Sequence, residues 1–255
     1  WLPPAGSTLA SEIDPLFNFI LYACAVFFAI VVGGMIYFGW RYRRRQKAGL
    51  TVAPTHNTAL ELVWTILPTI LLAILFVWGT KSFIRMHVVP KDAIEIKTTG
   101  QKWFWTFDYP NGASTVNELV VPIRKPVKLL LSSKDVIHSF YVPDFRIKMD
   151  ALPNRYTVAW FEATRLGEFR VFCTEFCGKG HSEMLGLVRV VTDSQYVKWI
   201  DSSSTLGEGM TPEEYGRVLY KAKACNTCHS IDGARMVGPS FLGKFGTEEI
   251  VKGGE

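Results

Sequence analysis

The sequence predicts a multidomain membrane protein, in which a hairpin of two membrane-spanning helices is followed by an all-β domain and a short helical segment. Two apolar blocks near the N-terminus carry almost no charge. A long stretch of short runs with alternating polarity follows them. The C-terminal part begins with a capped helix and contains a Cys-x-x-Cys-His motif. A chain of 255 residues is long enough for about two domains.

The net charge is mildly positive, +5, and much of it comes from one basic cluster, Arg41–Lys47. In nucleic-acid-binding proteins, basic residues are interleaved with a folded element that reads the bases. Here the cluster directly follows an apolar block, so we expect no nucleic-acid partner.

The first apolar block runs from Phe17 to Trp40 without a charged residue. It is long enough to cross the ~30 Å hydrocarbon core of a bilayer as one helix. Tyr37 and Trp40 lie at its end, where amphipathic aromatic residues favour the headgroup level. A buried helix of a soluble protein is the alternative, but such helices rarely stay uncharged over this length.

The charges on its flanks predict the orientation of this helix. Loops rich in Lys and Arg stay cytoplasmic, and the cluster Arg41–Lys47 follows the helix directly. Glu12 and Asp14 lie on the other flank, so we expect the N-terminus outside. A second apolar block, about residues 60–83, returns the chain to the outside and completes a membrane-anchored segment, residues 1–90. Its Pro68 is tolerated better in a membrane helix than in a soluble one.

Glu61 stands at the cytoplasmic start of the second helix. A carboxylate at a membrane boundary is costly unless it is solvated or paired, which makes Glu61 a functional candidate. An ordinary interfacial glutamate fits the sequence equally well.

After about Pro90 the hydrophobic pattern changes to period two. Ile94, Ile96 and Thr98 alternate with charged residues, and four further strand-like runs are separated by turn residues: Val127–Leu131, Tyr156–Phe161, Glu168–Phe172 and Leu185–Val191. Many short strands with turn signals predict a sandwich or barrel, which we place at residues 91–192.

Residues 100–105 concentrate three aromatic side chains in what we expect to be one strand. By period two, Trp103 and Trp105 would share one face and Phe104 would point to the other. Core and interface packing explains such aromatic residues without any functional role.

Residues 193–210 lose the apolar pattern and contain serine and glycine clusters, which predict a linker. A helix is expected next, from Thr211 to about Ala224. Thr211 is suited to its N-cap, Pro212 to its first position, and Glu214 completes a capping box.

The loop between Cys173 and Met184 carries the candidate metal ligands Cys173, Cys177, His181 and Met184, with His138 available upstream. Paired cysteines near a histidine indicate a metal or haem rather than a disulfide framework. One zinc ion would use the two thiolates and two imidazoles and would leave Met184 without a role. Copper electron-transfer sites combine these ligands with a weak thioether on a β-sandwich, so we favour copper.

Two thiolates in place of one suggest two copper ions. Cys173 and Cys177 would each bridge both ions, so that the pair shares one electron and changes its geometry little on reduction. His138 and His181 would cap one ion each, and Met184 and one backbone carbonyl would fill the weak positions.

Cys225-Asn-Thr-Cys228-His229 is the attachment motif of a c-type haem. The two thiols would form thioethers, and His229 would be the proximal iron ligand. The capped helix before the motif and Gly238-Pro239 after it support haem attachment over chance occurrence.

The pattern Cys-x-Glu-x-Cys-x-x-x-His-x-x-Met, with the upstream stretch His138–Pro143 and the two-helix hairpin, resembles subunit II of the haem-copper cytochrome oxidases and its binuclear CuA centre. The resemblance covers about residues 10–192. It implies a cupredoxin-like Greek-key domain on the outer face of the membrane. It also implies that Glu175 gives copper its backbone carbonyl and reaches a Mg²⁺ site at subunit I with its side chain.

The same resemblance implies roles for two further residues. The first tryptophan of the family's aromatic patch is the point at which electrons enter, and here it would be Trp103. The neighbouring Lys102 changes the usual Gln-Trp spacing, so the outer surface of the patch is expected to differ. Glu61, in a Glu-x-x-Trp-Thr-Ile-Leu-Pro run, resembles the glutamate at the cytoplasmic mouth of a proton channel in subunit I.

Residues 211–255 resemble the N-terminal part of a small all-α class I cytochrome c domain. In that family a prolyl carbonyl accepts a hydrogen bond from the proximal imidazole, and Pro239 matches this role. The segment is roughly half of such a domain, so we expect the chain to continue beyond Glu255. Met236 precedes Pro239 and is not expected to be the sixth iron ligand.

These resemblances imply the electron-input subunit of a proton-translocating cytochrome c oxidase in a bacterial inner membrane, with its C-terminal domains in the periplasm. Electrons would pass from haem c through CuA to subunit I, which reduces O₂ to water. The expected partners are subunit I, subunit III, membrane lipid, and a cytochrome c or a quinol-oxidising complex as donor.

Three alternatives were weighed against this interpretation. A quinol oxidase subunit II would lack the copper ligands, and a nitrous oxide reductase would need more than the five histidines present. A free-standing, membrane-anchored electron-transfer protein remains compatible with the sequence. The five histidines also include no set that could bind an O₂-reducing haem and copper, so we expect no oxygen chemistry in this chain alone.

Overall fold

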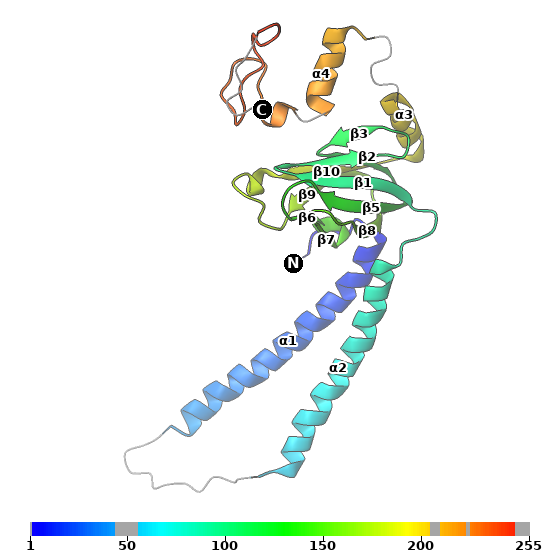
Figure 1. The fold of residues 1–255 in the computed structure, drawn as a ribbon. Helices are drawn as coiled ribbons and strands as arrows, with labels where there is room; N and C mark the ends of the chain where they lie inside the picture. Colours follow the sequence, from blue (N-terminus) through cyan, green and yellow to red (C-terminus); the bar gives the residue numbers. More distant parts are fainter. Residues whose placement is uncertain (1, 44–55, 205–209, 223–224, 248–255) are drawn as a thin grey trace. The chain divides into compact units, whose positions relative to one another are not determined.

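The computed structural model of the chain describes residues 2–43, 56–204, 210–222 and 225–247 (Figure 1). Its residues form two compact units. One is helical and spans Leu9–Val88, and the other contains the strands and spans Pro3–Thr8 with Val89–Glu255.

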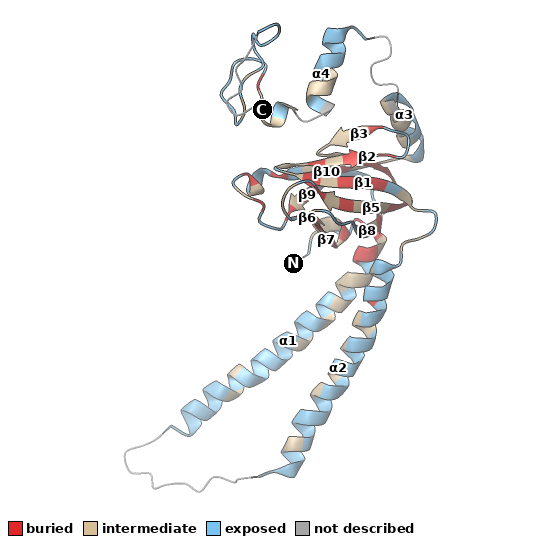
Figure 2. Cartoon of the chain, in the orientation of Figure 1, coloured by how far each residue is buried: buried red, intermediate tan, exposed pale blue. Residues whose placement is uncertain are grey.

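The helical unit consists of α1 (Thr8–Arg41) and α2 (Thr58–His87). Both are long and apolar enough to cross a membrane. Figure 2 shows them exposed along most of their length, as expected for helices whose apolar surface faces lipid. The two predicted spans are confirmed; the basic residues 44–47 lie outside the described part of the chain.

The start of α1 differs from the prediction. The sequence analysis began the first helical span at Phe17, but the helix begins at Thr8 and contains Pro15. Leu9 and Ala10 are buried, so packing stabilises the first turns of the helix. A sequence rule that looks only for an uncharged span does not detect such packing.

The β unit is a sandwich of two five-stranded sheets, ordered β3-β2-β1-β5-β8 and β4-β10-β9-β6-β7. The strands are β1 (Ile94–Gln101), β2 (Phe104–Asp108), β3 (Ser114–Val116), β4 (Glu118–Pro122), β5 (Pro126–Ser133), β6 (His138–Val142), β7 (Ile147–Ala151), β8 (Thr157–Glu162), β9 (Gly167–Cys173) and β10 (Leu185–Val191). The pairs β1–β5 and β4–β10 are parallel, and the other pairs are antiparallel. The predicted sandwich is confirmed.

Aromatic residues fill the core between the sheets. The Phe140 ring of β6 lies edge-on to Trp105 and Phe107 of β2, with ring centroids 5.3 and 6.2 Å apart. All three are fully buried. Figure 2 shows the buried residues gathered in these strands, so the sandwich is a rigid support for the loops at its ends.

The sequence analysis expected residues 100–105 to form one strand, but they do not. A turn at Lys102 and Trp103 separates β1 from β2, and Gln101 faces Phe104 in the antiparallel register. Trp105 therefore points into the core while Trp103 lies on the turn, and the two do not share a strand face. The period-two rule fails because the chain reverses between them.

The predicted linker also differs in its first part, because residues Asp193–Ser204 form helix α3. Trp199 packs edge-on against Tyr109 at a centroid distance of 4.9 Å, and Asn111 donates a hydrogen bond to the carbonyl of Ile200. A Thr192–Gln195 capping box that the sequence analysis overlooked starts this helix. Residues 205–209 lie outside the described part.

Helix α4 (Pro212–Ala222) confirms the predicted helix and its capping box. The amide of Glu214 donates to Thr211 Oγ1 at 3.3 Å, and the Glu214 carboxylate accepts from the amide of Thr211 at 2.9 Å. This hydrogen bonding lowers the pKa of Glu214. Residues 223–224 are not described, and Cys225–Thr227 form a 3-10 turn.

Candidate metal centre

The candidate metal ligands meet where two neighbouring strands and one loop come together. Cys173 is the last residue of β9 and pairs with Phe140 of β6, two residues after His138. The loop after Cys173 returns through a 3-10 turn, His181–Glu183, to Met184. The amide of Cys173 donates to the carbonyl of Met184 at 3.3 Å and closes the base of the loop.

The side chains of the predicted ligands lie within contact of one another. Cys173 Sγ is 3.8 Å from Cys177 Sγ and 3.9 Å from His138 Nδ1. Cys177 Sγ is 3.5 Å from His181 Nδ1 and 3.8 Å from the Met184 sulfur. The backbone carbonyl of Glu175 lies 3.3 Å from Cys173 Sγ. The structure thus brings together every side chain that the sequence analysis selected for copper.

Burial affects the pKa values of the two cysteine thiols at this site. His138 and Met184 are fully buried, and the two cysteines are nearly so. Burial raises the pKa of Cys173, but hydrogen bonds from His138 and from backbone groups outweigh it, so the pKa of this thiol is lowered. Burial and the neighbouring Cys173 raise the pKa of Cys177. A cation bound beside both thiols would favour the thiolate form of each.

The donor set matches copper better than zinc. Two sulfurs, two imidazoles, a thioether and a carbonyl surround one space, and such soft donors favour copper. A single tetrahedral zinc ion would leave Met184 and the Glu175 carbonyl unused. The cluster is consistent with a CuA centre.

Trp103 is fixed against the ligand loop. Its indole Nε1 donates a hydrogen bond to the carbonyl of Cys177 at 3.2 Å. A Cβ built on Gly180 would lie 2.6 Å from Trp103 Cδ2, so only glycine allows the ring to lie this close. The tryptophan is thus one hydrogen bond away from a candidate copper ligand.

The two candidate glutamates have different surroundings. Glu175 is exposed, and its carboxylate is not part of the one cluster of three His, Cys, Asp or Glu donors found among the described residues. Glu61 lies at the start of α2, where its carboxylate is 2.9 Å from His56 Nδ1 and accepts weakly from the amide of Asn57 at 3.4 Å.

The haem-attachment motif forms a second candidate site. His229 Nδ1 lies 2.7 Å from the carbonyl oxygen of Pro239, and its ring stacks on Phe241 at 4.5 Å. The hydroxyl of Tyr220 donates to the carbonyl of His229. A Cβ on Gly238 would come within 2.5 Å of the imidazole, which explains the Gly-Pro pair after the motif.

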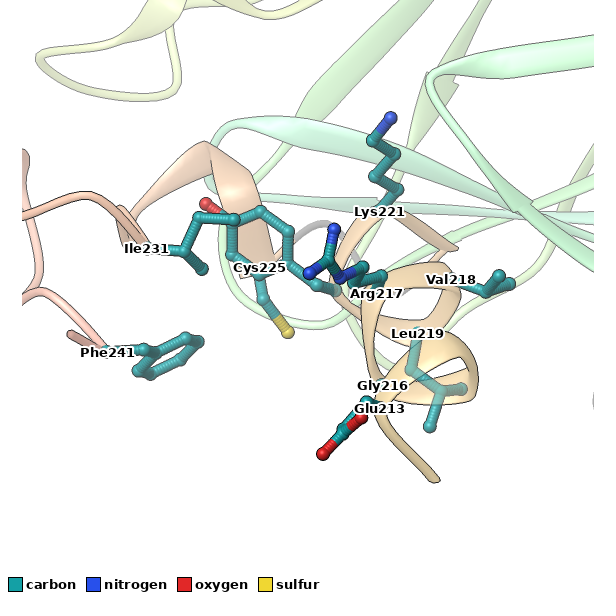
Figure 3. A pocket seen from close by; sticks show the side chains of 10 residues that line it. Glu213, Gly216, Arg217, Val218, Leu219, Lys221, Cys225, Ile231 and Phe241 are labelled. Carbon is teal, nitrogen blue, oxygen red and sulfur yellow. The ribbon is translucent and has the colours of Figure 1, made fainter. Parts of the chain in front are cut away.

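An open cleft of about 940 Å³ lies beside this motif. Figure 3 shows Cys225 between the side chains of α4 and Phe241. Leu219, Ile231 and Phe241 line the cleft with apolar surface, and Arg217 and Lys221 add positive charge. Met236 is exposed and does not line it.

The sequence analysis missed Asp135 as a functional residue. Its carboxylate lies 2.8 Å from His138 Nε2, on the side of the ring opposite the cysteines. The available signal was its position three residues before a predicted histidine ligand, because carboxylates often orient such ligands.

Comparison with known proteins gives consistent matches. The family "Cytochrome C oxidase subunit II, transmembrane domain" matches residues 1–83, and "Cytochrome C oxidase subunit II, periplasmic domain" matches residues 112–191. "Cytochrome c oxidase subunit 2" of Alkalihalophilus pseudofirmus is 32% identical over 240 residues, covering 90% of this chain and 68% of that protein. "Alternative cytochrome c oxidase subunit 2" of Bradyrhizobium diazoefficiens is 31% identical over 236 residues, covering 80% and 84%.

Among solved structures, the periplasmic domain of subunit II of the Bradyrhizobium japonicum cytochrome oxidase is 34% identical. It has a TM-score of 0.45, and the match covers 46% of this chain and 98% of that one.

Replacing Gly100 by alanine is expected to weaken metal binding. The added Cβ would lie 2.9 Å from His138 Cδ2 and 3.2 Å from Trp105 Cζ3, and both rings are fully buried and cannot move away. A displaced ligand ring should lower copper affinity about tenfold or more, measured as copper retained against a chelator. Gly216→Ala on α4, where a Cβ meets nothing within 4 Å, is the control. Unchanged affinity of Gly100→Ala would contradict the packing described for His138.

Proposed function

We propose that this chain, which belongs to the cytochrome c oxidase subunit II family, passes electrons through CuA to subunit I. Its C-terminal Cys-x-x-Cys-His motif further suggests that the electrons enter through a covalently attached haem c. The observation that carries this proposal is the assembly of two cysteines, two histidines and a methionine at the end of β9. Subunit I, whose chemistry this chain does not contain, would reduce O₂ to water and couple the reaction to proton pumping.

The chain is a membrane protein with two membrane-spanning helices and a periplasmic, cupredoxin-like domain. Ser7, just before α1, pairs with Ala163 of the β unit and donates a hydrogen bond to the carbonyl of Phe145. The N-terminus therefore lies on the same side as the periplasmic domain. We place both on the outer side of a bacterial inner membrane.

The copper ligands have distinct tasks in this proposal. Cys173 and Cys177 would hold the copper with their thiolates, and His138 and His181 would bind it through their Nδ1 atoms. Met184 and the carbonyl of Glu175 would supply the weaker ligands. When bound, the copper pair supplies a carrier for single electrons. The protein holds the ligand atoms close together even without the metal. This preformed arrangement limits the change in ligand positions when the centre gains or loses an electron.

Trp103 is the proposed point at which electrons enter. Its hydrogen bond to the carbonyl of Cys177 links the periplasmic surface to a copper ligand. Lys102 precedes it and is exposed, so a donor surface here differs in charge from the usual Gln-Trp sequence.

Residues 211–255 are proposed to belong to a cytochrome c domain. Cys225 and Cys228 would hold the haem by thioethers, and His229 would bind its iron. The Pro239 carbonyl is placed to accept the His229 Nδ1 proton, which leaves the other ring nitrogen free for the iron. When attached, haem c supplies a further carrier for single electrons. Its donor would be a cytochrome c or a quinol-oxidising complex.

Partner contacts complete the proposal. Subunit I is the partner implied by family membership, and subunit III is a further expected partner. The exposed side chain of Glu175 is available for a Mg²⁺ site shared with subunit I. Glu61, paired with His56 at the start of α2, is available for the mouth of a proton channel.

Affinity purification of the tagged full chain in mild detergent tests the proposal as a whole. A multi-helix haem protein should co-purify, and the chain itself should carry covalent haem that survives denaturing electrophoresis. The double variant Cys225→Ala/Cys228→Ala should lose that haem and keep its copper. Purification without a haem-containing partner would favour a free-standing electron carrier, and absent covalent haem in the native chain would overturn the cytochrome assignment.

Trp103→Phe is expected to slow reduction of the copper centre without loss of copper. Phenylalanine fills most of the space but cannot donate to the Cys177 carbonyl, a bond worth about 1 kcal/mol. If the lost bond raises the barrier to electron transfer by the same amount, transfer slows roughly fivefold, as stopped-flow absorbance would measure. Trp199→Phe on α3 is the matched control. Copper loss in Trp103→Phe would mean that the indole has a structural role instead.

Glu61→Gln is expected to lower steady-state turnover of the assembled oxidase while copper and haem c stay intact. The amide keeps an acceptor for the Asn57 backbone but removes the ionisable group. Oxygen consumption gives the readout, and Glu95→Gln, which changes an exposed carboxylate paired with Lys128 on the β unit, is the control. Full turnover of Glu61→Gln would identify Glu61 as an ordinary interfacial residue.

A further inference from the structure

Asp135 lies in the turn between β5 and β6, where its carboxylate joins three parts of the domain. One oxygen, Oδ1, is 2.8 Å from His138 Nε2 and accepts from the Val136 amide at 2.7 Å. The other oxygen, Oδ2, accepts from the Lys102 amide at 2.8 Å. The Asp135 side chain is only 25% exposed, and His138 is fully buried.

The contact with Asp135 determines which nitrogen of His138 faces the metal. Because Nε2 donates to the carboxylate, Nδ1 keeps its lone pair and points toward Cys173 Sγ, 3.9 Å away. Gly100 and Trp105 pack against the same ring and prevent it from turning. The imidazole is therefore held by a hydrogen bond at one end and by packing at its side.

The second carboxylate oxygen connects the metal centre to the turn that carries Trp103. Lys102, whose amide it binds, directly precedes Trp103, and Trp103 donates to the carbonyl of Cys177. One carboxylate thus holds both a ligand ring and the backbone beside the proposed path of electrons.

The other imidazole of the centre has no such support. His181 Nδ1 faces Cys177, and among the described residues no hydrogen bond reaches its Nε2. His181 instead lies beside the exposed ring of Phe176, with centroids 5.7 Å apart. The two histidines therefore differ in the group behind them, a carboxylate in one case and an exposed aromatic ring in the other.

We propose that Asp135 is a positioning residue of the metal centre, which orients His138 and makes it a stronger donor than His181. This inference rests on the copper assignment of the proposed function. A carboxylate behind an imidazole raises its basicity and so stabilises the more highly charged, oxidised metal. Loss of the carboxylate should therefore weaken copper binding and raise the reduction potential.

The test compares Asp135→Asn, Asp135→Ala and the native full chain, each purified in detergent and loaded with copper. Asparagine retains an oxygen acceptor and removes the charge, whereas alanine removes both. Asp108→Asn is the control, because Asp108 is exposed at the end of β2 away from the Trp103 turn. Copper affinity is measured by competition with a chelator, and the potential by optical redox titration.

We expect copper affinity to fall about 10- to 100-fold in Asp135→Ala and less in Asp135→Asn, with upward shifts of potential in the same order. Asp108→Asn should match the native chain. Native affinity and potential in both Asp135 variants would overturn the inference. The inference would also be overturned if the only effect of the two Asp135 substitutions were slower, salt-sensitive reduction by the electron donor. Asp135 would then act only in docking of the donor. A native chain that binds no copper would overturn the proposed function itself.

Discussion

Two buried thiols 3.8 Å apart are the constraint on which the rest of the molecule depends. The pKa of Cys173 is lowered by its hydrogen bonds and that of Cys177 is raised by burial and by Cys173, so a cation beside them would favour the thiolate form of both. Strand β9 delivers the first thiol and the start of β6 delivers His138 beside it. The loop that returns through His181 to Met184 then encloses the second thiol with donors suited to a soft metal.

The scaffold gives this site both rigidity and location. The packed rings of Trp105, Phe107 and Phe140 support the strand ends that carry the ligands. Asp135 and Trp103 add hydrogen bonds to His138 and to the carbonyl of Cys177. The two apolar helices supply the membrane anchor of the chain.

The sequence was sufficient for the parts whose signals are local. The two apolar spans, the alternating strands, the Thr211–Glu214 capping box and the side chains that meet at the candidate metal centre could be predicted from spacing and polarity. The turn at Lys102 and Trp103 could not, because aromatic residues look alike in a strand and in a tight reversal. Helix α3 was missed because its composition is polar and because its contacts with the β unit, Trp199 on Tyr109 and Asn111 on Ile200, form only in the folded chain. Asp135 acquires its role only through folding, which brings Lys102 to one of its oxygens.

We propose that Cys173 and Cys177 would together hold two copper ions that share one electron. Paramagnetic resonance of the purified native chain, combined with metal analysis of the same sample, tests this proposal most directly. We expect two copper ions per chain at this centre and hyperfine splitting from one electron shared equally by two copper nuclei. A single zinc ion, or the spectrum of one isolated copper, would contradict it.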